Sequence, residues 1–198
     1  SNTREVSVEH FVKYCLETRQ AKNAQNQRPN RTPDDPALAL YLEDVESGQD
    51  TRTSLMVRNI PNKYTQSMFL NEIRAGGHGD KIDFFYLPID FKNKCNRGYT
   101  FINFIDSSDI ATFYKMYNTK PWKNFNSEKL CAIKYARIQG QAAMVKRFEN
   151  SALMEKDAEY RPLIFDKRGE PEEFPKNDIQ KLSLSGDVAS STSSAASS

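Results

Sequence analysis

Residues 97–104, with the sequence Arg-Gly-Tyr-Thr-Phe-Ile-Asn-Phe, have the alternating pattern of a β-strand. Successive side chains of a strand point to opposite faces. One face therefore carries two rings and an amide and the other carries small or branched residues: Tyr99, Phe101 and Asn103 against Thr100, Ile102 and Phe104. The second face suits a core. The first, beside the cation of Arg97, suits single-stranded nucleic acid, because bases stack on rings and phosphates attract cations. An ordinary strand with packed rings is the alternative.

The same octapeptide matches the RNP1 pattern of the RNA recognition motif, with Thr100 in place of the usual Gly or Ala. Short motifs give false matches, so the assignment needs a partner strand upstream. Residues 55–60 supply it, because Leu-Met-Val-Arg-Asn-Ile resembles the RNP2 pattern of a first strand. Alternation directs Met56 and Arg58 to the outer face. Met56 stands where the family usually has a ring, so we expect one stacking platform fewer.

The remaining elements complete the order β-α-β-β-α-β. Thr65 is a plausible N-cap of a helix that ends at Gly76-Gly77, and residues 82–88 form the second strand. A second helix begins near Ser107 or Ser108, and residues 130–137 form the fourth strand. This order predicts an α+β, ferredoxin-like fold, in which a four-stranded antiparallel sheet has two helices on one face and leaves the other face open.

Further candidates for RNA contact come from the other strands and from one loop. Both faces of residues 82–88 are apolar, and counting back from residues 97–104 places Phe84 and Tyr86 outward, although a packed edge is almost as good a reading of Tyr86. The loop 90–96 is basic and either clamps phosphates or is simply solvated. The complete predicted set is Tyr99, Phe101, Arg97, Met56, Arg58, Asn103, Tyr86, Phe84, Lys92, Lys94, Lys134 and Arg137.

Charge is distributed unevenly along the 198 residues. Residues 51–150 hold sixteen Lys plus Arg against eight Asp plus Glu, a balance of +8, whereas the remainder holds 12 basic and 18 acidic residues. A basic module between acidic flanks is typical of a domain that binds a polyanion. Chance clustering on a solvated surface is the alternative, and the coincidence with the RNP strands favours the first interpretation.

No pattern of an enzyme, cofactor site or metal site is present. Paired carboxylates with a role and an activated nucleophile are both missing, and Gly76-Gly77-His78-Gly79 lacks the Lys-Ser/Thr of a phosphate loop. Three cysteines without CxxC spacing and two histidines make a zinc site improbable and favour a reducing compartment. No apolar run is long enough to cross a bilayer, and no signal peptide is visible, so we expect no membrane partner.

We expect six segments: an amphipathic helix in 1–21, a linker in 22–35, a docking segment in 36–52, an RNA recognition motif in 53–140, a C-terminal helical extension in 141–165 and a disordered tail in 166–198. The extension begins with a helix in residues 141–153, with Met144, Phe148 and Leu153 apolar. This helix could cover part of the predicted RNA face as a gate, or could extend the core elsewhere. The pattern does not choose between the two.

Longer runs carry a more specific resemblance. Residues 53–64, 85–99, 125–129 and 135–140 closely resemble the C-terminal RNA recognition motif of the Mei2-like meiosis regulators of fungi and plants. The resemblance, which covers about residues 41–165, implies a nuclear protein, able to shuttle to the cytoplasm, that controls entry into meiosis and binds non-coding RNA. A protein-interaction module that uses the sheet face or the flanking helices is the alternative function. The preferred RNA sequence, the oligomeric state and the role of residues 1–40 stay open.

Overall fold

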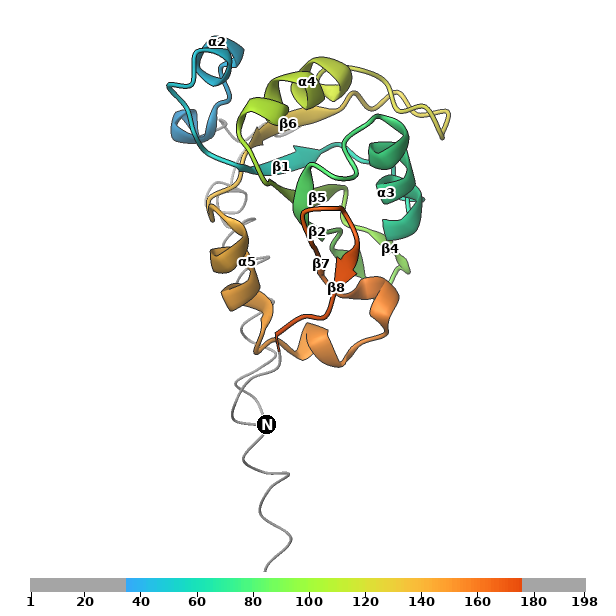
Figure 1. The fold of residues 1–198 in the computed structure, drawn as a ribbon. Helices are drawn as coiled ribbons and strands as arrows, with labels where there is room; N and C mark the ends of the chain where they lie inside the picture. The colour runs from blue at the N-terminus through green and yellow to red at the C-terminus, as the bar shows by residue number, and fades with distance from the viewer. Residues whose placement is uncertain (1–34, 176–198) are drawn as a thin grey trace, which may run out of the picture.

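The computed structural model describes residues 35–175 (Figure 1). The predicted helix (1–21), residues 22–34 of the predicted linker (22–35) and residues 176–198 of the predicted tail (166–198) lie outside the described residues. In chain order the elements are η2 (Pro36–Leu38), α2 (Leu42–Glu46), β1 (Ser54–Arg58), α3 (Gln66–Ala75), β2 (Ile82–Tyr86), β3 (Ile89–Asp90), β4 (Cys95–Asn96), β5 (Tyr99–Phe104), α4 (Ser108–Tyr117), β6 (Ala132–Tyr135), α5 (Gln141–Phe148), η3 (Ala152–Glu155), η4 (Ala158–Tyr160), β7 (Leu163–Phe165) and β8 (Pro171–Glu172).

The sheet has six strands in the order β6-β1-β5-β2-β7-β8, and every pair within it is antiparallel. Four adjacent members of this order, β6, β1, β5 and β2, are the predicted four strands, which confirms the ferredoxin-like fold. Two additions correct the prediction. β7 pairs with β2 through Phe84 and Ile164, and β8 extends the edge from residues that were assigned to the disordered tail.

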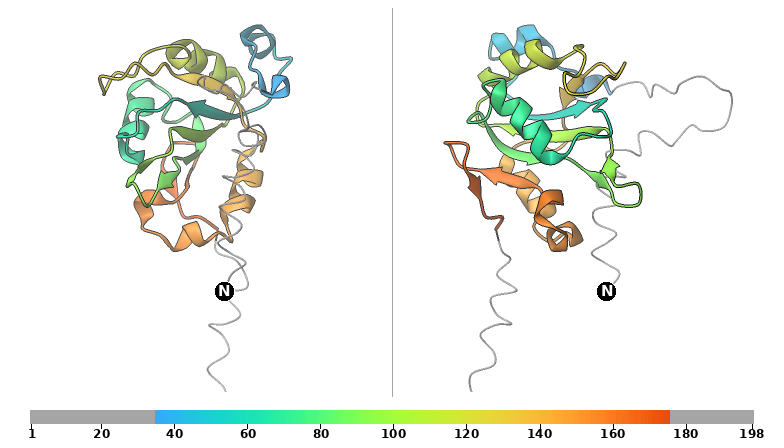
Figure 2. Two further views of the ribbon diagram at one scale, coloured as in Figure 1. Left: turned by 180° about the vertical axis from the view of Figure 1, so that it is seen from behind. Right: turned by 90° about the vertical axis from the view of Figure 1, so that its right-hand side faces the viewer.

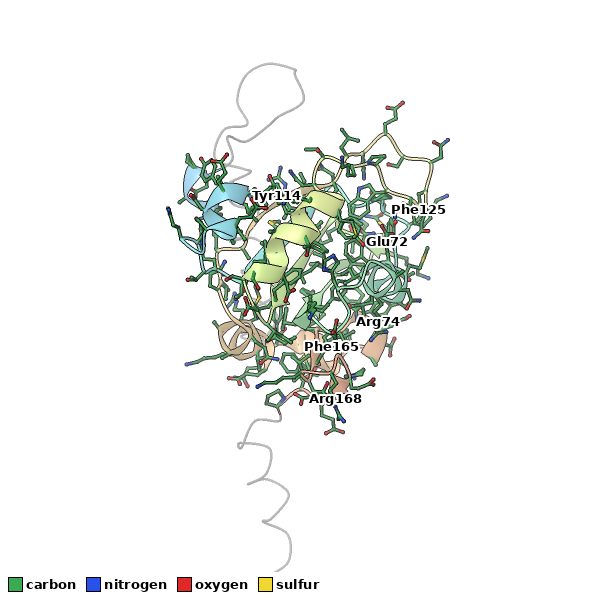
Figure 3. The ribbon with its side chains drawn as sticks, turned by 45° about the horizontal axis from the view of Figure 1, so that its top comes forward. Glu72, Arg74, Tyr114, Phe125, Phe165 and Arg168 are labelled. Carbon is green, nitrogen blue, oxygen red and sulfur yellow. The ribbon has the colours of Figure 1, made fainter. Side chains whose placement is uncertain are left out.

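One face of the sheet packs on α3 and α4 and forms the larger core (Figures 1 and 3). The side chain of Thr65 accepts a hydrogen bond from the backbone N–H of Met68, so the predicted N-cap of α3 is confirmed. The strands and the two helices contribute apolar side chains that are all fully or nearly buried, among them Ile102 and Phe104, which were predicted to face the core. The residues are Leu55, Val57, Ile102, Phe104, Ile133, Phe69, Ile73, Ile110 and Phe113.

The segment before β1 docks on this helical layer, where α2 packs against α4. Arg52 lies with its guanidinium carbon 3.8 Å from the centroid of the Tyr135 ring and forms a 2.7 Å ion pair with Asp50. This hydrogen-bonded pair holds the pKa of Asp50 below its usual value. Residues 36–52 therefore pack on α4, and Arg52 reaches Tyr135 of the edge strand β6.

His78 is a buried titratable group in the helical core, with 4% of its surface exposed. Its ring meets Phe113 edge-on at a centroid distance of 5.3 Å, and burial lowers its pKa, against the opposite influence of the carboxylates of Asp109 and Asp80. As the pH falls, the His78 imidazole is therefore protonated at a higher pH in the unfolded chain than in the folded chain. Below about pH 6.5, where an unfolded histidine begins to be protonated, the free energy of unfolding should fall as the pH falls.

Chemical denaturation at pH values from 7.5 to about 5 measures this effect in the wild type and in His78→Phe. The variant should lose the histidine's share of the pH dependence, because phenylalanine fills the same aromatic site and does not titrate. Parallel stability profiles for the two proteins would show that His78 contributes nothing to acid sensitivity.

Candidate nucleic-acid interface

The predicted stacking rings lie on the face of the sheet opposite α3 and α4. Met56 pairs across the strands with Phe101 and with Lys134, and Tyr86 pairs with Phe101, so their side chains share that face. Tyr99, Phe101, Phe84 and Tyr86 belong to a second apolar cluster, separate from the helical core. The face that alternation assigned to these residues is therefore the face they occupy.

This second face is covered. α5 lies across the sheet from α3 (Figures 1 and 2) and contributes Met144 and Phe148 to the cluster, both almost fully buried. The Phe148 ring lies 4.9 Å from that of Tyr86 and 6.0 Å from that of Phe84, measured between centroids. Tyr99 is 4% exposed and Phe101 1%. The four strands and two helices alone leave this face open, but the helix after the fourth strand supplies apolar side chains that pack on the rings, which is the first of the two placements that the sequence left open.

The start of α5 is held by hydrogen bonds to β1 and β2. The Gln139 side-chain oxygen accepts from the backbone N–H groups of Thr53 and Ser54 at 3.1 and 2.9 Å, and the Gly140 N–H donates to Ser54 Oγ at 2.8 Å. Gln141 Nε2 donates to the backbone carbonyl of Asp83 at 2.9 Å. These contacts set the direction in which the helix leaves the sheet, and they place its apolar side over the rings.

Asn103 has a structural role that replaces its predicted RNA contact. Its amide oxygen accepts from Thr53 Oγ1 at 2.8 Å and Ser54 Oγ at 2.6 Å, and its Nδ2 donates to Asp83 Oδ1 at 2.7 Å and to the Phe104 carbonyl at 3.1 Å. The side chain is 3% exposed, and burial raises the pKa of the neighbouring Asp83. All four hydrogen-bonding positions of the amide are used within the protein, so none is left for a base.

The predicted basic residues fall into two groups. The first group belongs to β1, β6 and the residues after β6. Arg58 and Lys134 are half-buried on the covered face of the sheet, and Arg137 forms a 3.0 Å ion pair with Asp35. Arg97, Lys92 and Lys94 are exposed at the end of the sheet where β2 leaves and β5 enters. Cations therefore border the covered rings.

The basic loop is itself ordered as a β3–β4 hairpin. The Asp90 carboxylate accepts hydrogen bonds from the backbone N–H groups of Lys92 and Asn93 at 3.0 and 3.1 Å, and from Asn93 Nδ2 at 2.8 Å. The bonds from Asn93 hold the pKa of this carboxyl below its usual value. Lys92 and Lys94 thus project from a turn of fixed shape.

Two features of this region were missed in the sequence. Phe91, in the hairpin turn, is 47% exposed, and its only signal is an aromatic ring within a polar loop. Ile164 on β7 joins the ring cluster, but a strand of three residues is too short to show a period. Within residues 35–175, no cluster of potential metal ligands is found and no helix is long and apolar enough to cross a membrane.

Residues 52–149 match the family model described as RNA recognition motif 2. The chain is 51% identical over 144 residues to "Protein MEI2-like 2" of Oryza sativa subsp. japonica, an alignment that covers 71% of this chain and 17% of that protein. It is 47% identical over 154 residues to "Protein MEI2-like 5" of Arabidopsis thaliana, covering 78% and 19% respectively. The chain thus spans less than a fifth of the length of these curated relatives.

Among solved structures, the Rna15 RRM with bound RNA (GU) is 15% identical, with a TM-score of 0.35, and the match covers 42% of this chain and 82% of that one.

Proposed function

The chain belongs to the Mei2-like family through its RNA recognition motif, a non-enzymatic module, and from this we propose that it binds single-stranded RNA on the ring-bearing face of the sheet when α5 moves aside. Tyr99, Phe101 and Tyr86 would stack bases, and the bordering cations would attract phosphates. The observation that carries the proposal is the placement of the rings. They lie outside the helical core, in a cluster that they share with α5, with Leu153 of η3 and with Ile164 of β7.

The helix has the properties of a displaceable cover. α5 has eight residues, fewer than an isolated helix needs to be stable in water, so its persistence depends on contacts with the sheet. Burial of Met144 and Phe148, the two buried residues of α5, contributes about 1.5–3 kcal/mol each. Stacking of bases contributes about 1–3 kcal/mol per base. Because the two totals are comparable, RNA can compete with the cover, at a reduced apparent affinity.

A second candidate function rests on the same cover. A sheet face occupied by a helix of its own chain shows that this surface accepts an apolar peptide segment. The module could then bind a partner protein through the sheet face or through the flanking helices.

Salt dependence discriminates between the two functions. Phosphate contacts release counterions, so the logarithm of the RNA association constant should fall steeply with the logarithm of salt concentration, by about 0.7 per contacted phosphate for single strands. Lys92→Gln with Lys94→Gln should make the slope shallower by about 1.4, because two such contacts are lost. The measurement is fluorescence anisotropy with a randomised single-stranded RNA pool at several salt concentrations.

Lys167→Gln is the matched control, since this exposed lysine lies in the turn between β7 and β8, away from the hairpin, where Gly169 approaches Gly79. It should leave the slope unchanged. Weak RNA binding with a slope near zero, together with tight binding of an apolar peptide, would favour the protein-interaction function.

The cellular role, the location and the type of RNA partner are further parts of the proposal. The names of the relatives suggest a meiosis regulator, and we infer for this chain a nuclear location and a non-coding RNA partner. Imaging of the fluorescently tagged protein during meiosis, and sequencing of the RNA that cross-links to it, would test both. A cytoplasmic signal throughout, or recovery of messenger RNA alone, would contradict them.

A further inference from the structure

A groove of about 650 Å³ lies outside the sheet face, between the loop that precedes α3, the β3–β4 hairpin and η4. Figure 1 shows α3, β4 and the orange segment before β7 on the same side of the molecule. The volume of the groove is in the range of sites that hold small molecules, which is ample for one nucleotide. Phe91, Tyr160 and Tyr64 line it together with Lys63 and Lys94. Aromatic and cationic side chains thus meet in one concave surface.

The walls of the groove are fixed by buried hydrogen bonds. Asn96, 1% exposed, donates through Nδ2 to the backbone carbonyls of Pro61 and Tyr64, at 2.8 and 3.0 Å, which joins the hairpin to the loop before α3. Gln66 Nε2 donates to the Arg161 carbonyl at 3.0 Å, which joins α3 to the segment after η4. A ligand would therefore meet a surface that is already formed, and pre-formed surfaces lose little affinity to ordering.

Phe91 is the aromatic residue of the groove that is most open to a ligand. It is 47% exposed, whereas Tyr64 is 1% exposed. The Tyr160 ring packs roughly perpendicular to it at a centroid distance of 5.4 Å, and Lys156 Nζ lies 5.5 Å from the Phe91 ring centroid. A half-exposed ring that is braced by a second ring and bordered by ammonium groups matches the stacking platforms used by single-stranded nucleic acids.

The charge around the groove favours a nucleotide over a neutral peptide. Lys63 and Lys94 line it and are exposed, and Lys129 Nζ donates to Asn62 Oδ1 at its rim at 2.7 Å. Glu159 is the acidic residue among those that line it. An apolar floor that accepts a base and ammonium groups that accept the adjoining phosphates are the two parts of a nucleotide site.

We propose that this groove is a second RNA site, which takes one unstacked base of a single strand against Phe91 and holds the adjoining phosphates with Lys63 and Lys94. The inference rests on the proposed function and deepens it. α5 does not line the groove, so the groove is accessible while the rings of the sheet are covered. RNA would therefore make its first aromatic contact here, before the helix is displaced.

The test uses the full chain and oligouridylates in which one uridine is replaced by the photoreactive 4-thiouridine, with cross-linked peptides identified by mass spectrometry. Cross-links at Phe91 or Tyr160 are expected in addition to those on β5. In parallel, Phe91→Ala should weaken binding of oligouridylate about tenfold, a typical effect of removing one stacking ring. Phe91→Trp should retain the affinity, because tryptophan offers a π-face on which a base can stack. Phe91→Leu should lose it, because leucine is apolar but has no π-face.

Tyr41→Ala is the matched control, since Tyr41 is a 61% exposed ring on the segment that docks at α4. It should not change the affinity. Cross-links on β5 alone, with wild-type affinity for Phe91→Ala, would overturn the groove and leave the proposed function standing. Equal affinities for Phe91→Leu and Phe91→Trp would overturn stacking in the groove. The absence of any RNA binding by the wild type would overturn both proposals.

Discussion

Replacement of Met144 and Phe148 by alanine should tighten the binding of single-stranded RNA at least tenfold. The two substitutions remove most of the apolar contact between α5 and the rings, and each lost side chain weakens the closed state by about 1.5–3 kcal/mol. Apparent affinity is the intrinsic affinity reduced by the fraction of molecules that are competent to bind, so a larger open fraction gives tighter binding. Fluorescence anisotropy with labelled RNA measures the change.

Ala143→Ser is the control for this variant, because Ala143 lies on the exposed side of α5. It alters the same helix without touching the sheet and should bind RNA as the wild type does. Circular dichroism should show that the double variant keeps the sheet and the helical core, since Met144 and Phe148 belong to the second cluster. A folded double variant whose affinity is unchanged or weaker would show that α5 does not compete with RNA.

Replacement of Tyr99 and Phe101 by leucine should weaken RNA binding roughly thirtyfold or more, because two stacking platforms contribute at least about 2 kcal/mol together. Leucine is preferred to alanine here, since both rings are buried under α5 and alanine would leave cavities. Leucine keeps much of the apolar volume and lacks a π-face. Isothermal titration with the tightest-binding RNA from a randomised pool measures the loss.

Phe113→Leu provides the comparison, because Phe113 is a fully buried ring of the helical core and is remote from the candidate interface. It too should lower the free energy of unfolding, but its RNA affinity should be that of the wild type. If both variants lost affinity equally, the effect would reflect general destabilisation instead of lost stacking.

Residue patterns predicted the fold and the membership of each face. The alternation in residues 55–58 and 99–104 placed Met56 and Phe101 on one face and Val57 and Ile102 on the other, and the strand register confirms it. Thr65 marked the start of α3 because an N-cap signal is local. Such features depend on neighbours within a few residues, and the sequence carries them directly.

The covering of the candidate interface could not be predicted in the same way. The apolar spacing of Met144 and Phe148 predicts that one side of α5 is buried, but this spacing does not indicate which surface of the protein that side packs against. The direction of α5 depends on bonds between Gln139 and residues about 85 positions earlier in the chain, such as Ser54. Asn103 was misread for a similar reason. Its hydrogen-bond partners come from β1 and β2, and no pattern in the neighbouring sequence predicts them.

A double-mutant cycle for RNA affinity tests the central claim most directly. It compares the wild type, the Met144→Ala/Phe148→Ala variant, the Tyr99→Leu/Phe101→Leu variant and the protein with all four changes. If the covered rings are the binding surface, loosening α5 should tighten binding at least tenfold, and replacing the rings should weaken binding both in the wild type and in the loosened protein, because apparent affinity is the product of intrinsic affinity and open fraction. No gain from loosening α5, or no loss from replacing the rings in the loosened protein, would contradict the account, because RNA would then be binding elsewhere.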